Sequence, residues 1–101
     1  MKLDDLTQGM RVVVRTDGTV EQLGGKQTLA QLYDHIGNGC DCIDVVNLRR
    51  HGLVMIVDDM GAYQQPDVNY IASDLYHEIC VPGTTWPIRG NVVIVPDTDF
   101  A

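Results

Sequence analysis

Apolar and polar positions follow two different periods along this chain, which predicts an alternation of strands and helices. Short runs rich in β-branched residues, bounded by glycine, proline or aspartate, are typical of strands. Such runs lie at residues 10–15, 20–23, 42–48, 53–58 and 91–95. Asp17-Gly18 separates the first two runs and residues 49–52 separate the next two, so each pair is predicted to form an antiparallel hairpin.

The run Leu53–Val57 differs from the others because it is apolar at every position. A strand with one solvent-exposed face alternates apolar with polar residues, whereas a strand in the middle of a sheet can be apolar throughout. We therefore expect this run to be a central strand whose two faces are both covered or partly covered. The last run is predicted to end at Pro96, because proline cannot donate to a strand ladder.

A first helix is predicted to begin at Leu29. Thr28 and Gln31 form a capping box, in which the threonine hydroxyl and the glutamine amide each satisfy a free backbone N–H group. Gly37 or Gly39 provides the left-handed stop. The predicted buried face consists of Leu29, Leu32, Tyr33 and Ile36.

A second, short helix is predicted after Pro66, beginning near Asp67 or Asn69. Its buried stripe has a spacing of four and comprises Ile71, Leu75 and Ile79. The segment 58–61 before it is predicted to be a turn, in which aspartate side chains accept hydrogen bonds from backbone N–H groups and glycine takes a positive φ.

These elements predict one α+β domain over residues 1–101, with a mainly antiparallel sheet of about four to six strands and two short helices packed on one face. The chain of 101 residues is 45% hydrophobic and 21% charged, which fits one globular domain with a single core. A chain of this length can bury roughly 65% of its surface, so we expect folding to need neither a metal ion nor a disulfide.

The charge and the apolar runs exclude some classes of function. With 14 acidic and 7 basic residues, the chain has a net charge of -7 and would repel the phosphates of DNA and RNA, so we expect no direct nucleic-acid binding. The apolar runs are far shorter than the roughly 20 residues of a membrane-spanning helix, and the N-terminus lacks an apolar signal core. Together with an odd number of cysteines, these features indicate a cytoplasmic protein.

Candidate catalytic and metal-binding groups are present, but each set is incomplete. Cys40 and Cys42 share one face of an extended segment, yet their spacing is shorter than in structural zinc sites and no second such pair exists. Ser73 and His77 can share a helix face, but no nucleophile elbow or oxyanion donor accompanies them. We therefore predict no catalytic residues, no bound metal and no cofactor.

Five segments carry a resemblance to a known family. They are residues 36–39, 43–46, 57–61, 66–72 and 88–95, and they are spread over the stretch from the first helix onward, about two thirds of the chain. In these segments the chain resembles a family of small domains of unknown function that actinobacterial phages and mobile elements encode. It departs from the family pattern in an additional Asp67 and in Gln64-Gln65, where an apolar residue is common. The resemblance implies a phage or mobile-element setting and no particular catalytic activity.

These observations predict a small non-enzymatic phage accessory protein that binds a host protein in the host cytoplasm and modulates or inhibits it. One alternative is a nucleotide-sequestering anti-defence protein, with a cleft or subunit interface lined by Arg49, Arg50 or Arg89. Another is a small enzyme of unknown class, with a pocket that gathers His77, Ser73 or Asp58. Self-association into a homo-oligomer is left open.

The candidate partner-binding residues are Trp86, Arg89, Arg49 and Arg50. Tryptophan and arginine are among the residue types most enriched at binding hot spots. Trp86 lies in a segment rich in glycine and proline, and it is predicted either to contact a partner or to fold inward over the sheet edge. Arg49 and Arg50 belong to the only basic cluster, on a hairpin tip where they either bind a carboxylate or phosphate or keep the loop solvated.

Overall fold

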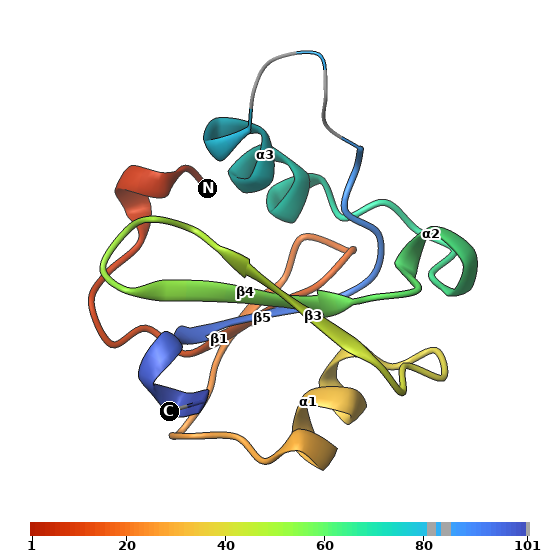
Figure 1. Cartoon of the computed structure of the whole chain (residues 1–101), viewed down its shortest axis with the longest axis horizontal. Helices are drawn as coiled ribbons and strands as arrows, with labels where there is room; N and C mark the ends of the chain where they lie inside the picture. The colour runs from red at the N-terminus through yellow and green to blue at the C-terminus, as the bar shows by residue number, and fades with distance from the viewer. Residues whose placement is uncertain (81–82, 84–85, 101) are drawn as a thin grey trace.

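A computed structural model describes residues 1–80, 83 and 86–100 of the chain (Figure 1). The strands are β1 (Val12–Val14), β2 (Val20–Gln22), β3 (Ile43–Asn47), β4 (Leu53–Asp58) and β5 (Val92–Pro96). The helices are α1 (Leu29–Ile36), α2 (Gly61–Gln64) and α3 (Tyr70–Ile79), with short 3-10 turns η1 (Leu3–Asp5) and η2 (Asp97–Phe100) near the two ends. Residues 81, 82, 84 and 85, in the segment between α3 and β5, lie outside the described residues.

The strands form one five-stranded sheet in the order β2-β1-β5-β4-β3, and every neighbouring pair is antiparallel. Both predicted hairpins are present, as β1 with β2 and as β3 with β4. The last strand joins them, because β5 pairs with β1 on one side and with β4 on the other. The predicted α+β class with an antiparallel sheet is thus confirmed.

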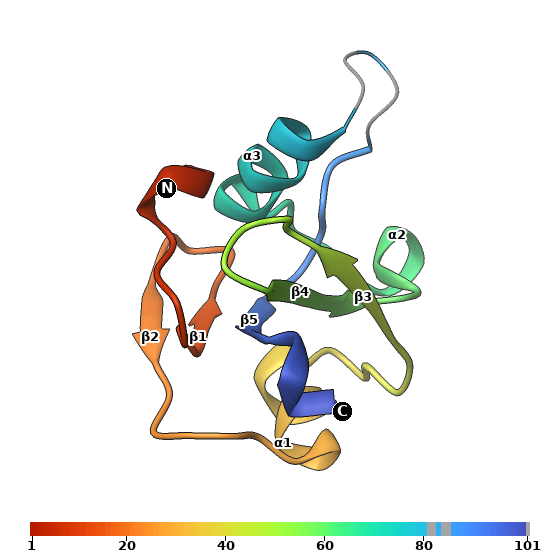
Figure 2. The same cartoon turned by 60° about the vertical axis from the view of Figure 1, so that its left-hand side comes forward.

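The two longer helices cover opposite faces of the sheet, so the prediction that both lie on one face is wrong (Figures 1 and 2). On α1, Leu32 and Ile36 pack on the face that carries Val13, Val54, Ile56, Val93 and Val95. On α3, Ala72 and Leu75 pack on the other face, which includes Met55 and Ile94. The physical reason is the composition of β4 and the core of β5, which are apolar on both sides and need two covers.

The ends of α1 follow the predicted local chemistry. The Gln31 backbone N–H donates to Thr28 Oγ1 at 3.1 Å, and the Thr28 N–H donates to Gln31 Oε1 at 2.8 Å. Gly37, with φ 71°, follows the last helical residue. The predicted buried face is correct for Leu32 and Ile36, and Tyr33 is partly buried against the same core, whereas Leu29 in the first turn is 52% exposed.

The second predicted helix is α3, and Asn69 is its N-cap, since the Asn69 side chain accepts from the Ala72 N–H at 3.0 Å. Leu75 is fully buried, while Ile71 and Ile79 are partly buried against the same core. In the predicted turn, Asp58 accepts from the Met60 N–H, but the expected positive φ at Gly61 is wrong, because Gly61 is the first residue of the single-turn helix α2. Neither α2 nor the 3-10 turns were predicted. One turn of helix carries too little periodicity to be read from a sequence.

Candidate functional site

The segment 86–90 is held between α2 and the beginning of α3 (Figures 1 and 2). Its residue Arg89 forms an isolated antiparallel bridge with Val68. The Asn69 N–H donates to the Ile88 carbonyl at 2.8 Å, and the Gly90 N–H donates to the Asp67 carbonyl at 2.9 Å. Residues far apart in the sequence are therefore tied together at one end of the sheet.

A buried polar network supports this end. Asp58 accepts hydrogen bonds from the Met60 N–H at 2.8 Å and from the Gln65 side-chain amide at 2.9 Å. The same amide group donates to the Gly37 carbonyl at 3.1 Å, and Gln65 Oε1 accepts from Asn38 Nδ2 at 2.9 Å. Within the described residues, every buried side-chain nitrogen and oxygen has a partner. The buried side-chain amide of Gln65 therefore has a hydrogen-bond partner for both its nitrogen and its oxygen, and it links α1, β4 and α2.

The predicted candidate Arg89 uses its guanidinium group within the chain. Its Nε donates to the Gln65 carbonyl at 2.9 Å, and its Nη2 donates to the Pro66 carbonyl. These carbonyl groups lie at the end of α2 and just beyond it, where helix carbonyls lack partners in the helix. Arg89 thus fastens the segment that leads from Trp86 into β5.

Trp86 is 82% exposed, so the alternative in which it folds inward over the sheet edge is wrong. Tyr63 on α2 is 86% exposed, and Tyr70 at the beginning of α3 is 73% exposed. We refer to Tyr63, Tyr70 and Trp86 together as the aromatic surface. They belong to α2, the beginning of α3 and segment 86–90, and hydrogen bonds join that segment to the residues between α2 and α3. Neither tyrosine is among the residues predicted from the sequence, although Tyr70 lies off the predicted buried stripe of α3 and Tyr63 directly precedes two glutamines.

The predicted candidates Arg49 and Arg50 lie elsewhere. They belong to the β3–β4 turn, where β4 begins. At its other end β4 reaches Asp58, which bonds the side chain of Gln65, and the Gln65 carbonyl accepts from Arg89. Arg50 Nη1 donates to Asp4 Oδ1 at 2.8 Å in an exposed ion pair, while Arg49 is exposed with φ 57°. The candidate arginines are consequently at opposite ends of the sheet and do not line one common cleft.

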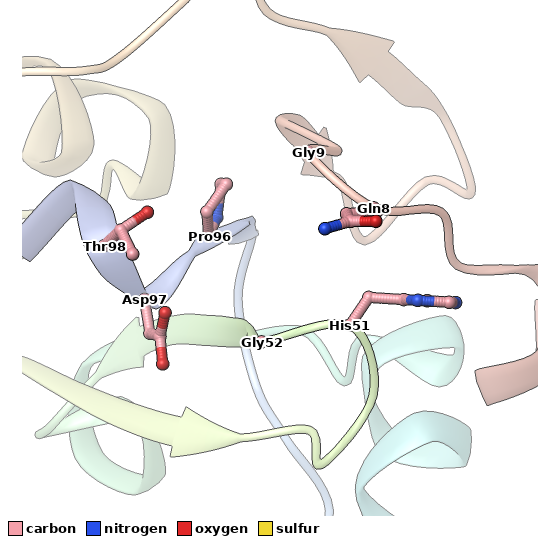
Figure 3. A pocket seen from close by; sticks show the side chains of 7 residues that line it. All are labelled: Gln8, Gly9, His51, Gly52, Pro96, Asp97 and Thr98. Atoms are coloured by element: carbon pink, nitrogen blue, oxygen red, sulfur yellow. The ribbon is translucent and has the colours of Figure 1, made fainter.

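A shallow hollow of about 470 Å³ lies beside this turn (Figure 3). Its lining residues are Gln8, Gly9, His51, Gly52, Pro96, Asp97 and Thr98. The ring of His51 extends away from the other lining side chains, as Figure 3 shows. The side chains that line the hollow therefore do not form a cluster of converging charged groups.

The candidate catalytic residues Ser73 and His77 do not form a hydrogen-bonded pair among the described contacts. The Ser73 hydroxyl accepts from the Ile88 N–H at 2.9 Å and contacts the Ile88 carbonyl at 3.3 Å, so it ties α3 to segment 86–90. His77 is exposed on α3. In the part of the chain that the structure describes, no three His, Cys, Asp or Glu side chains converge as a metal site requires. In that same part, no helix is long and apolar enough to cross a bilayer.

The thiols of Cys40 and Cys42 are both free. Burial, followed by the negative charge of Asp58, raises the pKa of the Cys40 thiol. Partial desolvation, followed by the charges of Asp59 and Asp41, raises the pKa of the more exposed Cys42 thiol. A raised pKa keeps a thiol protonated at neutral pH, which disfavours both nucleophilic attack and metal ligation.

A partly buried ion pair anchors η2 near the C-terminal end of the described chain. Arg11 donates to Asp99 twice, from Nε to Oδ2 at 3.0 Å and from Nη2 to Oδ1 at 2.8 Å. The Asp99 side chain is only 7% exposed. The hydrogen bonds from Arg11 are the main cause that lowers the pKa of Asp99 below its usual 3.8.

We expect the substitution Asp99→Asn to reduce stability at neutral pH, with an effect that depends on pH. Because the pKa of Asp99 is lowered by folding, its contribution is present above the ordinary value of 3.8 and is lost as the pH falls through the lowered value. The measurement is the difference in unfolding free energy between wild type and variant from neutral to strongly acidic pH. Asp4→Asn is the control, since the exposed pair of Asp4 with Arg50 contributes little. A constant difference for Asp99→Asn would contradict the assignment.

Comparison of the chain with family models, with curated proteins and with solved structures gives no match. The resemblance to phage-encoded domains therefore stays a prediction. The features of this chain that bear on its function are the aromatic surface and the net negative charge.

Proposed function

We propose that this protein is a non-enzymatic accessory protein, encoded by a phage or mobile element, that binds a host protein in the host cytoplasm and modulates its activity. The observation that carries the proposal is the aromatic surface. Three large aromatic side chains, each more than 70% exposed, project from neighbouring segments that hydrogen bonds hold in place. Exposed aromatic residues on a rigid base are the usual anchors of a protein interface, because they bury a large area at a small entropic cost.

Trp86 is the proposed centre of this contact, and Arg89 is its support. The guanidinium of Arg89 donates to carbonyls of the chain itself, so its role is to position the segment that carries Trp86. A net charge of -7 favours a partner whose contact surface is basic. The nucleotide-sequestering alternative has less support, since the three arginines that it requires lie at two opposite ends of the sheet.

We expect Trp86→Ala to abolish capture of a host protein while changing the free energy of unfolding by no more than about 0.5 kcal/mol, because the ring is 82% exposed. The measurement is a pull-down from host lysate with mass spectrometry, together with thermal unfolding of the same variant. Leu29→Ala is the matched control, since it also removes an exposed apolar side chain, but from α1 on the other face.

Three outcomes would overturn the proposal. Equal capture by wild type and Trp86→Ala would remove the aromatic surface from the interface. A loss of about 3–5 kcal/mol of stability in Trp86→Ala would make the ring structural. A thermal shift that a nucleotide produces, with no host protein captured, would favour the nucleotide-sequestering alternative.

A further inference from the structure

Among the described residues, the free edge of β3 is the longest open edge of the sheet. The sheet order places β3 at one edge and β2 at the other. β3 has five residues, whereas β2 has only three. An open strand edge presents unpaired backbone N–H and C=O groups, which pair readily with another strand.

The hydrogen bonds to β4 determine which residues of β3 face this edge. The Asp59 N–H donates to the Cys42 carbonyl at 2.9 Å, and the Leu48 N–H donates to the Leu53 carbonyl at 3.1 Å. In an antiparallel pair, hydrogen-bonded and non-hydrogen-bonded positions alternate. The even-numbered residues of β3 therefore bond to β4, and the backbone groups of the odd-numbered ones point outward. These outward residues are Ile43, Val45 and Asn47.

We propose that the β3 edge pairs with the β3 edge of a second copy of this chain, in an antiparallel register centred on Val45. This register joins the two sheets into one continuous sheet. It places Val45 opposite its own symmetry mate and Ile43 opposite Asn47 of the other copy. All three outward-facing residues of each strand then occupy hydrogen-bonded positions, so the edge is complementary to itself, as a two-fold interface requires.

The side chains and charges of the edge agree with this register. The Val45 side chain is 48% exposed, and pairing of two β-branched residues across strands is favourable. Asp41 precedes the strand and Arg49 follows it, each four residues from Val45. The two-fold register therefore brings Asp41 of one copy toward Arg49 of the other, at both ends of the interface. Both side chains are exposed, and no ion pair within the described residues involves either of them.

One contact has to change when the copies meet. In the isolated chain the Val45 N–H donates to Oδ1 of the neighbouring Asp44 at 2.9 Å. This side chain protects the open edge, which is a common use of charged residues on edge strands. The net charge of -7 on each copy also opposes association. We consequently expect a weak dimer, formed at high protein concentration and at physiological ionic strength, where charges beyond about 8 Å are screened.

The test is the dissociation constant from sedimentation equilibrium, combined with amide hydrogen exchange. We expect the amides of Ile43, Val45 and Asn47 to exchange more slowly as the dimer forms. Val45→Pro removes an N–H that makes no bond to β4, and it should weaken the dimer at least about tenfold. Val45→Thr keeps the N–H and is the matched control, with a dissociation constant close to that of wild type.

A charge exchange tests the register itself. Asp41→Arg and Arg49→Asp should each weaken the dimer about tenfold, because each replaces two attractive pairs by two repulsive ones. The double variant restores opposite charges and should return to nearly the wild-type constant. A monomer at every concentration, a dimer that is insensitive to Val45→Pro, or a double variant without recovery would overturn the proposal. Trp86→Ala should dimerise as wild type, so this inference stands or fails separately from the proposed host interaction.

Discussion

Replacing Gly90 with alanine is expected to lower the free energy of unfolding by about 3 kcal/mol. Gly90 has φ 86°, a backbone conformation that residues other than glycine adopt only at a cost in free energy. A Cβ atom there would also lie 2.6 Å from Cγ, Cδ and Oε1 of Gln65. Gln65 is held by hydrogen bonds to Gly37, Asn38 and Asp58, so it cannot move away without breaking the buried network.

Gly18→Ala separates the two causes of this loss. Gly18 has a similar φ of 91°, but a Cβ atom there meets nothing within 4 Å. The control should therefore cost only the conformational part, about 1 kcal/mol. Chemical denaturation of both variants is the measurement, and equal losses would show that the contact with Gln65 is unimportant.

Asn69→Ala is expected to destabilise the protein by about 3 kcal/mol. The substitution removes the N-cap of α3 and leaves two buried carbonyl groups without a hydrogen-bond donor. Asn69 is fully buried. Its Nδ2 donates to the carbonyls of Val14 and Gly90, each at 3.0 Å, and its Oδ1 accepts from the Ala72 N–H. One side chain thus joins β1, α3 and the segment before β5. Thermal or chemical unfolding measures the loss.

Asn69→Asp tests the direction of these bonds. Aspartate keeps the capping oxygen, but it has to retain a proton to donate to a carbonyl, so folding should raise its pKa. A raised carboxyl pKa makes the variant more stable as the pH falls from about 7 to about 4, opposite to the behaviour of Asp99. Asn47→Ala, which removes an exposed amide bonded to the Arg49 N–H, is the control with a loss within about 0.5 kcal/mol. A pH-independent Asn69→Asp variant would contradict the assigned bonds.

Elements that depend on neighbouring residues were predictable from the sequence. The capping box at Thr28 and Gln31 determines where α1 begins, because both bonds act within one turn. Asp17 and Gly18 form the first hairpin turn, since Asp17 accepts from the Thr19 N–H and Gly18 takes a positive φ. These interactions do not depend on how the rest of the chain folds.

The placement of the helices depended on long-range pairing. Each amphipathic helix needs one apolar surface, and the helix sequence does not say which face of the sheet provides it. The apolar run Leu53–Val57 already indicated two covered faces, but it did not say which helix covers which. Insertion of β5 between β1 and β4 joins both hairpins into one sheet, and α1 and α3 then cover its opposite faces.

The same distinction between local sequence and long-range packing applies to the candidate site. The sequence identified Trp86 as a candidate, because residue type and local composition are visible in it. It also determined the acidic charge and located each strand to within two residues at either end. Only the tertiary structure decided that Trp86, Tyr63 and Tyr70 are all exposed. It also decided that the Arg89 guanidinium donates its hydrogen bonds to carbonyl groups of its own chain. Exposure and hydrogen-bond partners depend on residues that are distant in sequence, and packing alone brings those together.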